Sequence, residues 1–401
     1  MSQDLNLGAA WRKYLAVFEE AKTNITGSSR FGNNPDYRRR MYRAFMQVQA
    51  MSYNFAVVPR ADRPRSFIHT TYQTDFYTLG MACPDFYYAG LFLDGSRRYR
   101  ISGRVGATRW MAAQVQSHLM GDIRVRNVGD FDFADFELGA DGSFDIIASG
   151  GEERGNHIQL AAESSFNFIW VRRILGDWGD DPGELHVELL DSGSSKRQED
   201  DGTFLERLER AANLARFLLG NWAIGLHDWY LNLAQGYNRI AFLEGARVAD
   251  REVGSKAAYY AGFVFKLQAD EALLVEGDVP EGVYWSFQLG DVWSNSLDFL
   301  YHQSDLNMVR MKVDSDGRYR VVLAPVDPGL PNWLDTVGNL EGVGMMRVFR
   351  SPRRPTLPNL RVVKNAELAR LLPTQTQRVT PAERDRALAH REAAIKTMYC
   401  Q

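Results

Sequence analysis

Four side chains suited to acid–base chemistry lie close together in the segment 301–310, YHQSDLNMVR, and they are His302, Asp305, Asn307 and Arg310. A histidine and a carboxylate can move protons, and the planar fork of an arginine can hold an anionic or phenolate oxygen. If the segment is extended, alternate residues share a face, so Asp305 and Asn307 point the same way. We therefore predict that His302, Asp305 and Arg310 are catalytic. The alternative is an exposed strand of mixed charge.

Five residues are predicted to contact a substrate, and they are Tyr260, Trp285, Asn307, Arg347 and His227. The chain has 9 Trp, 17 Tyr and 22 Phe, enough to wall a pocket for a flat aromatic molecule. Three of the five residues also fit a structural role. Trp285 fits a sandwich core, and Arg347 fits an ion pair or a hydrogen bond to a loop carbonyl. His227 fits a helix surface beside a solvated Asp228.

These residues favour a cofactor-independent lyase or isomerase that moves protons on a small aromatic, phenolic or otherwise hydrophobic molecule. The main alternative is a non-catalytic module for small-molecule binding or assembly. A hydrolase of glycosides or esters is a third class, but no acid pair in the sequence favours it. The sequence has no Walker A motif, Gly-x-Ser-x-Gly elbow, His-Glu-x-x-His helix or strand-linked Gly-x-Gly-x-x-Gly. Because His302 and Asp305 have no third metal ligand close in sequence, we expect no metal and no organic cofactor.

Composition and charge bear on the partners and the location of the protein. Its 401 residues are 45% hydrophobic and 24% charged, which is ordinary globular usage. The net charge of -3 gives no basis for binding a polyanion, so we expect no nucleic-acid partner. No apolar stretch is long enough to predict a membrane span or a signal peptide, so a cytoplasmic location is expected. Two cysteines, Cys83 and Cys400, are too few for a disulfide framework. A homo-oligomer is one of the assemblies that the sequence allows.

An internal repeat indicates how these side chains are positioned. The tetrapeptide YYAG occurs at 87–90 and again at 259–262. Further matches follow at nearly constant spacing, and they pair Trp110 with Trp285, Asp141-Gly142 with Asp316-Gly317, Asn156 with Asn332, and Arg172 with Arg347. The spacing grows from 172 to 175 residues, which places a three-residue insertion at a turn before Trp285. We predict two copies of one domain with the same strand order, in which Trp110 is equivalent to Trp285.

Each copy has the pattern of β structure. DGSFDIIAS and DGRYRVVLA both begin with Asp-Gly and continue with aromatic and β-branched residues, as a turn that enters a strand does. The predicted fold class is mainly β with helical additions (α+β), as two duplicated antiparallel β-sandwich or jelly-roll-like domains joined by a helical segment. The predicted parts are an N-terminal helical region (1–86), a first β domain (87–190), a linker and helical segment (191–258), a second β domain (259–363) and a C-terminal helical tail (364–401).

Two helices are predicted before the first copy. Asn34 followed by Pro35 provides an N-cap and a first helical position. Before them, Trp11, Leu15 and Phe18 recur at helical spacing and predict a shorter helix with these residues on its apolar face.

Further helices are predicted between and after the copies. The polar linker DSGSSKRQEDDG at 191–202 precedes a capping box formed by Thr203 and Glu206. Apolar residues then continue at intervals of three and four, with a break expected near Gly220 or Gly225. A last helix is predicted to begin at the Thr380 cap.

The chain resembles bacterial proteins that carry the domains of unknown function numbered 1254 and 1214. The resemblance rests on YYAGLFLDGSRRYRISGRVG, on LGADGSFDIIAS followed by FIWVRRIL, and above all on YWSFQLGDVWSNSLDF, SDLN, DSDGRYRVVLAPVDPGLPNWLDT and MMRVF. It implies two β-rich domains with helical additions and no particular activity. One departure is His157, where the family pattern has a Trp after the Asn, as the second copy has in Asn332-Trp333.

Overall fold

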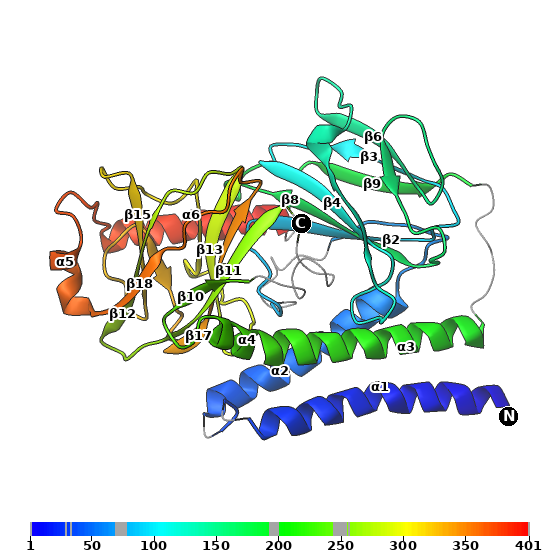
Figure 1. Ribbon diagram of the computed structural model, residues 1–401, viewed down its shortest axis with the longest axis horizontal. Coiled ribbons are helices and arrows are strands. Elements are labelled where there is room, and N and C mark those ends of the chain that lie inside the picture. Colours follow the sequence, from blue (N-terminus) through cyan, green and yellow to red (C-terminus); the bar gives the residue numbers. More distant parts are fainter. Residues whose placement is uncertain are drawn as a thin grey trace.

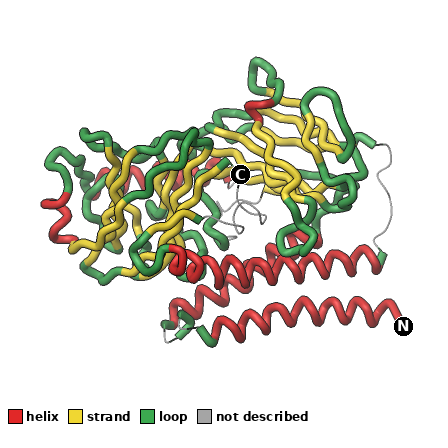
Figure 2. The backbone as a smooth tube through the Cα atoms, viewed as in Figure 1, coloured by secondary structure: helices red, strands yellow, loops and turns green. Residues whose placement is uncertain are grey.

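The computed structural model describes residues 2–28, 30–32, 34–68, 78–191, 200–243, 255 and 257–399. Within these ranges two β domains lie side by side, and the helices α1 (Ser2–Thr26), α2 (Pro35–Ser52) and α3 (Asp201–Phe217) run along one side of them (Figures 1 and 2). The predicted fold class is therefore confirmed as mainly β with helical additions and a duplicated domain. Most of the predicted polar linker, residues 192–199, lies outside the described residues.

The first β domain has two facing sheets. One sheet has, in order, the strands β1 (Phe67–Ile68), β2 (Phe86–Leu93), β8 (Asn167–Ile174), β4 (Trp110–Gln116) and β5 (Asn127–Asp132). The other has the strands β7 (His157–Gln159), β6 (Ser143–Ser149), β3 (Tyr99–Arg104) and β9 (Glu184–Leu189). Alternate residues such as Leu91, Ile101 and Val171 point between the sheets and form an apolar core.

The second β domain repeats this arrangement. Its first sheet has the strands β10 (Ile240–Phe242), β11 (Ala258–Lys266), β17 (Glu341–Phe349), β13 (Tyr284–Gly290) and β14 (Asp305–Asn307). Its second sheet has the strands β16 (Trp333–Asp335), β15 (Arg318–Ala324), β12 (Glu271–Asp278) and β18 (Asn359–Lys364). The strand order matches that of the first domain, down to a parallel pair at one edge, β6 with β7 and β15 with β16. The predicted common strand order is confirmed.

The strand register corrects the expected equivalence of the two tryptophans. Trp110 pairs with Ile174, whereas Phe349, which lies 175 residues after Ile174, pairs with Tyr284. Trp110 is therefore equivalent to Tyr284, and the prediction was wrong by one residue. Adjacent residues of a strand face opposite sides of the sheet. Trp285 accordingly lies in the core of the second sandwich, while Trp110 lies on an outer face and contacts the Phe349 ring at 5.2 Å.

The N-terminal helices are α1 (Ser2–Thr26) and α2 (Pro35–Ser52), which continues into the π-helix η1 (Tyr53–Val57). The Asn34 cap is confirmed, because its side-chain oxygen accepts a hydrogen bond from the Asp36 backbone at 3.0 Å. Helix α1 is longer than expected, and its buried face differs from the predicted one. Trp11 and Leu15 are 49% and 42% exposed, and the buried stripe is instead Ala10, Tyr14, Val17, Ala21 and Ile25.

The segment between the domains consists of α3 (Asp201–Phe217), the π-helix η3 (Leu218–Gly225) and α4 (Leu226–Leu233). The cap is Asp200, whose carboxylate accepts a hydrogen bond from the Thr203 backbone at 2.8 Å, so the predicted Thr203 cap lies three residues too far along. The expected break is present as the π-helix. Helix α3 packs on α1 and α2, whereas α4 packs on β10 and β11.

The C-terminal part has the short helix α5 (Leu368–Leu371) and the helix α6 (Pro381–Tyr399), with 3-10 turns at η4 (Asn365–Glu367) and, in the first domain, η2 (Phe133–Asp135). The Thr380 cap is confirmed as a capping box: the Thr380 backbone donates to Glu383 at 2.8 Å, and the Glu383 backbone donates to the Thr380 hydroxyl at 3.3 Å.

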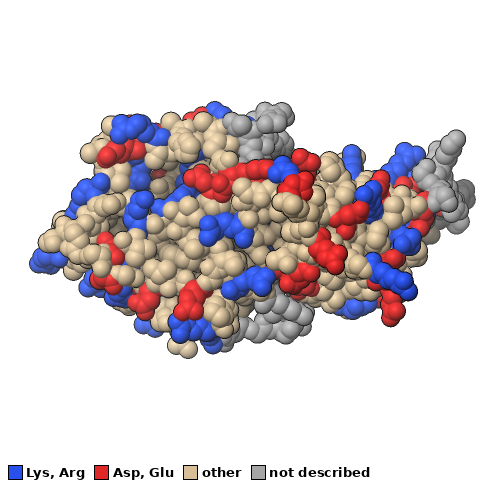
Figure 3. All heavy atoms as spheres, turned by 90° about the horizontal axis from the view of Figure 1, so that it is seen from above, with Lys and Arg blue, Asp and Glu red and all other residues tan. Residues whose placement is uncertain are grey.

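The surface carries both signs of charge. Lys and Arg side chains alternate with Asp and Glu over the face shown in Figure 3. Among the described helices, none combines the length and the apolar character needed to cross a membrane.

Candidate functional site

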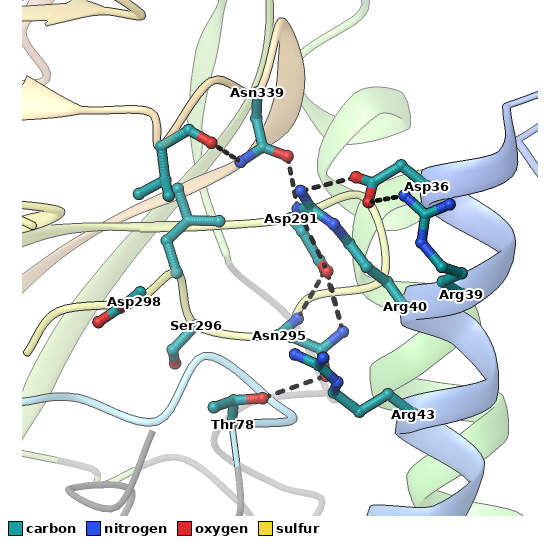
Figure 4. Close-up of a pocket in the computed structure, with 12 residues that line it drawn as sticks. Asp36, Arg39, Arg40, Arg43, Thr78, Asp291, Asn295, Ser296, Asp298 and Asn339 are labelled. Atoms are coloured by element: carbon teal, nitrogen blue, oxygen red, sulfur yellow. Dashed lines mark hydrogen bonds and ion pairs between the residues drawn. The ribbon is translucent and has the colours of Figure 1, made fainter. Parts of the chain in front are cut away.

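A pocket of about 330 Å³ lies between helix α2 and the loops at one edge of the second β domain (Figure 4). Helix α2 contributes Arg39, Arg40 and Arg43 to its wall, and the loop between β13 and β14 contributes Asp291 and Asn295. Its volume is at the lower end of the range found for small-molecule sites.

The apolar side of α2 determines where the arginines point. Met41, Ala44 and Val48 are fully buried against the other helices and the sheets. Arg39 and Arg43 are four residues apart, so they lie on one face of the helix, one turn from each other. The helix therefore presents cations to the pocket because its other side is occupied by the core.

Two of the three arginines are held by protein groups. Asp36 accepts from Arg39 at 3.1 Å and pairs with Arg40 at 2.7 Å. Arg40 also donates to the side-chain oxygen of Asn339 at 2.6 Å. Arg43 differs from both, since its exposed side chain forms no hydrogen bond or ion pair with any described residue. Arg43 is thus the cation of this wall that is available to a ligand.

The opposite wall is rigid because Asp291 organises its loop. One carboxylate oxygen of Asp291 accepts hydrogen bonds from the backbone nitrogens of Trp293 at 2.9 Å and Asn295 at 3.0 Å. Asp291 is only 3% exposed, and burial raises the pKa of its carboxyl group although Arg40 and these donors oppose the change. Arg40 approaches the second oxygen to 3.9 Å.

His302 forms a dyad with Asp335 near this pocket. The distance from His302 Nδ1 to Asp335 Oδ2 is 2.7 Å, and the His302 side chain is 38% exposed. Asp335 is held in turn by the Val337 backbone, which donates to it at 2.7 Å. Val337 lines the pocket, but His302 does not. The dyad fixes the orientation of the imidazole and leaves Nε2 without a partner among the described residues.

Asp305 and Arg310, the other two predicted catalytic residues, are in contact, but in a buried network. Arg310 donates to Asp305 and to Asp85 at 2.6 Å each, and Arg391 of α6 pairs with the other oxygen of Asp305. Both guanidinium groups stack on the Trp178 ring, at 4.2 Å and 3.7 Å from its centre. This network joins the two β domains and the C-terminal helix, and His302 belongs to a different cluster.

Tyr260 and Arg347 lie next to each other on the outer face of the sheet β10-β11-β17-β13-β14, since they pair across β11 and β17. Arg347 donates to Gln288 at 2.6 Å and to the backbone oxygen of Met81. The hydrogen bond to a loop carbonyl, one of the structural alternatives, is therefore present. Tyr260 is partly buried, and burial raises the pKa of its phenol.

The remaining predicted residues lie in the second domain and in helix α4. Trp285 is 1% exposed and packs on Tyr319 with ring centres 5.1 Å apart, in the sandwich core. Asn307 donates to the Gly176 backbone of the first domain at 2.8 Å. His227 is 2% exposed, so the alternative of a helix-surface histidine is wrong.

Sequence reasoning missed the pocket arginines. The residues 38–40 form a run of three arginines on a helix, and such a run opposite an apolar stripe usually indicates a solvated face. A local signal does exist, because Arg43 follows Arg39 by one turn. Nothing in the sequence indicates that the loop 291–298 faces this side of α2.

No family model and no curated protein match the chain. A solved structure of an uncharacterized protein from Burkholderia cenocepacia is similar, with a TM-score of 0.82 and 24% identity over 91% of this chain and 100% of that chain. A Vibrio parahaemolyticus protein gives a TM-score of 0.47 and 12% identity, over 80% of this chain and 98% of that chain. The first similarity shows a shared fold. Membership in the families of domains 1254 and 1214 stays a prediction.

Proposed function

We propose that the protein binds a small polar molecule with a carboxylate group in the pocket between α2 and the loop 291–298. The observation that carries this proposal is Arg43, a cation in the wall of a pocket that no described residue neutralises. An arginine can hold a carboxylate with two parallel hydrogen bonds. This function corresponds to the binding module among the alternatives from the sequence, with a polar ligand in place of an aromatic one.

The other lining groups limit the class of ligand. Asp36, Asp291 and Asp298 bring three carboxylates to a pocket that also has three arginines, so a ligand with several negative charges would be repelled. Thr78 and Ser296 offer hydroxyl groups. These features favour a molecule with one carboxylate and several hydroxyl or amino groups, such as a hydroxy acid or an amino acid.

Replacing Arg43 with Ala is expected to weaken the binding of such a ligand about tenfold or more, because a charge-assisted hydrogen bond is lost. The measurement is isothermal titration of the purified protein with a panel of hydroxy acids, amino acids and phenolic acids. Arg38→Ala is the matched control, because Arg38 is an exposed arginine of the same helix that does not line the pocket. Equal affinities for the two variants, or no binding by any compound, would reject the proposal.

A second candidate function is the cofactor-independent lyase or isomerase, with His302 as the proton-transfer group. The observation that favours it is the dyad, in which the buried oxygen of Asp335 lies 2.7 Å from His302 Nδ1 and the other ring nitrogen is open to a substrate. A carboxylate in this position holds the imidazole in one tautomer and stabilises its charged form.

If His302 transfers protons, His302→Ala is expected to lower kcat about a hundredfold for any substrate that a screen of small acids identifies. The control is His186→Ala, since His186 also lies beside a carboxylate, 3.7 Å from Glu184, but is 70% exposed on the first domain. Turnover that is unchanged in His302→Ala, or equally reduced in both variants, would remove this candidate.

A further inference from the structure

A row of polar side chains crosses the outer face of the sheet β10-β11-β17-β13-β14. Tyr260, Arg347 and Ser286 are directly paired across β11, β17 and β13, so their side chains lie on the same face. Tyr230 of α4 covers the next position of this face, because its ring lies on Gly262, where a side-chain carbon would come within 2.8 Å of the ring. This row is separate from the pocket beside α2.

Arg347 carries a buried charge without a counter-ion. It is 4% exposed, and its hydrogen-bond acceptors are the neutral side chain of Gln288 and the backbone of Met81. No carboxylate in the described part of the chain forms an ion pair with it. Buried arginines are ordinarily paired, because an unpaired guanidinium away from water is strongly disfavoured.

The residues around Arg347 include hydroxyl and thiol groups that can donate hydrogen bonds. The Tyr230 hydroxyl is buried and has no hydrogen-bond partner in the described structure. Burial raises the pKa values of Tyr230, Tyr260 and Tyr88, and it raises the pKa of the Cys83 thiol to about 12, so these groups are neutral at pH 7. A cation next to neutral hydroxyl and thiol donors is the environment that an anion requires.

We propose that Arg347 and the Tyr230 hydroxyl bind a small monovalent anion, either chloride or the carboxylate group of a small acid. The anion neutralises the guanidinium and accepts the hydrogen bond that the Tyr230 hydroxyl lacks within the protein. One negative charge balances the positive charge of Arg347, which has no counter-ion among the described residues.

The test compares two variants that each lose one unpartnered buried hydroxyl. Tyr230→Phe removes the hydroxyl over the sheet face that carries Arg347, and Tyr319→Phe removes one from the core of the second sandwich. The melting temperature of each protein is measured in a buffer free of chloride and carboxylates, while sodium chloride or sodium acetate is titrated in. We expect a saturable rise with at least one of the two salts in the wild type and in Tyr319→Phe, and an affinity about 10- to 100-fold weaker in Tyr230→Phe.

The two salts distinguish the sources of the anion, since saturation by chloride alone indicates an inorganic ion and saturation by acetate indicates a carboxylate ligand. A rise that does not saturate with either salt, or equal affinities for the two variants, would overturn the proposal. Arg43→Ala should leave this affinity unchanged, so failure of the pocket proposal and failure of the anion proposal give different results.

Discussion

Replacing Asp305 with Asn is expected to lower the free energy of unfolding by about 3–5 kcal/mol. Asp305 is 1% exposed and accepts from Arg310 and Arg391, and the second carboxylate of the network, Asp85, is also fully buried. Two carboxylates therefore balance two guanidinium groups. The substitution keeps the shape of the side chain and removes one negative charge, which leaves an uncompensated cation in the interior.

The midpoint of urea unfolding gives the measurement, with Glu153→Gln as the matched control. Glu153 also accepts two hydrogen bonds from an arginine, but its partner Arg98 is 52% exposed, so the loss should be below about 1 kcal/mol. If the two variants lose the same stability, the Asp305 network does not hold the domains together. A catalytic role for Asp305 predicts a different result, namely normal stability with lost turnover.

Replacing Trp285 with Ala is expected to cost about 3–5 kcal/mol, the usual penalty for removing a large aromatic side chain from a core. Trp285 is 1% exposed, and its ring packs on Tyr319 and Phe287. The substitution leaves a cavity between the two sheets of the second domain. Thermal and urea unfolding measure the loss.

Trp11→Ala is the control for this experiment, since Trp11 is 49% exposed on α1 and should change the stability by about 0.5 kcal/mol or less. The experiment also separates the two roles that the sequence left open for Trp285. If Trp285 formed a wall of a ligand site, Trp285→Ala would weaken ligand binding with little loss of stability. That result would contradict the position of Trp285 in the core.

The duplication could be predicted from the sequence because both copies use the same local signals. Asp-Gly turns before runs of β-branched residues mark the start of β6 and β15, and the YYAG tetrapeptides lie in β2 and β11. The register was harder to predict, since both copies have a tryptophan near the start of the third strand. An error of one residue places a side chain on the wrong side of a sheet, and Trp110 and Trp285 show this consequence.

The contact between Asp305 and Arg310 was within reach of the sequence because only five residues separate them. Their other partners were not, because Asp85 is 225 residues from Arg310 and Arg391 is 86 residues from Asp305. The same limit applies to the pocket, whose two walls come from α2 and from the loop 291–298. Contacts of this length are determined by how the domains and helices pack, and no local pattern encodes them.

The π-helix η3 sets the rotational phase between α3 and α4. Each residue of an α-helix advances by about 100°, so the wider turns of a π-helix change the direction in which all later side chains point. Helix α3 buries Ala211, Leu214 and Ala215 in the core that it shares with the other long helices, whereas α4 turns Tyr230 toward β11. In an uninterrupted α-helix, the angle about the helix axis between the buried residues of α3 and those of α4 would be different. The eight residues of η3 thus allow one continuous helical segment to pack on two differently oriented surfaces, the other long helices and the sheet that contains β11.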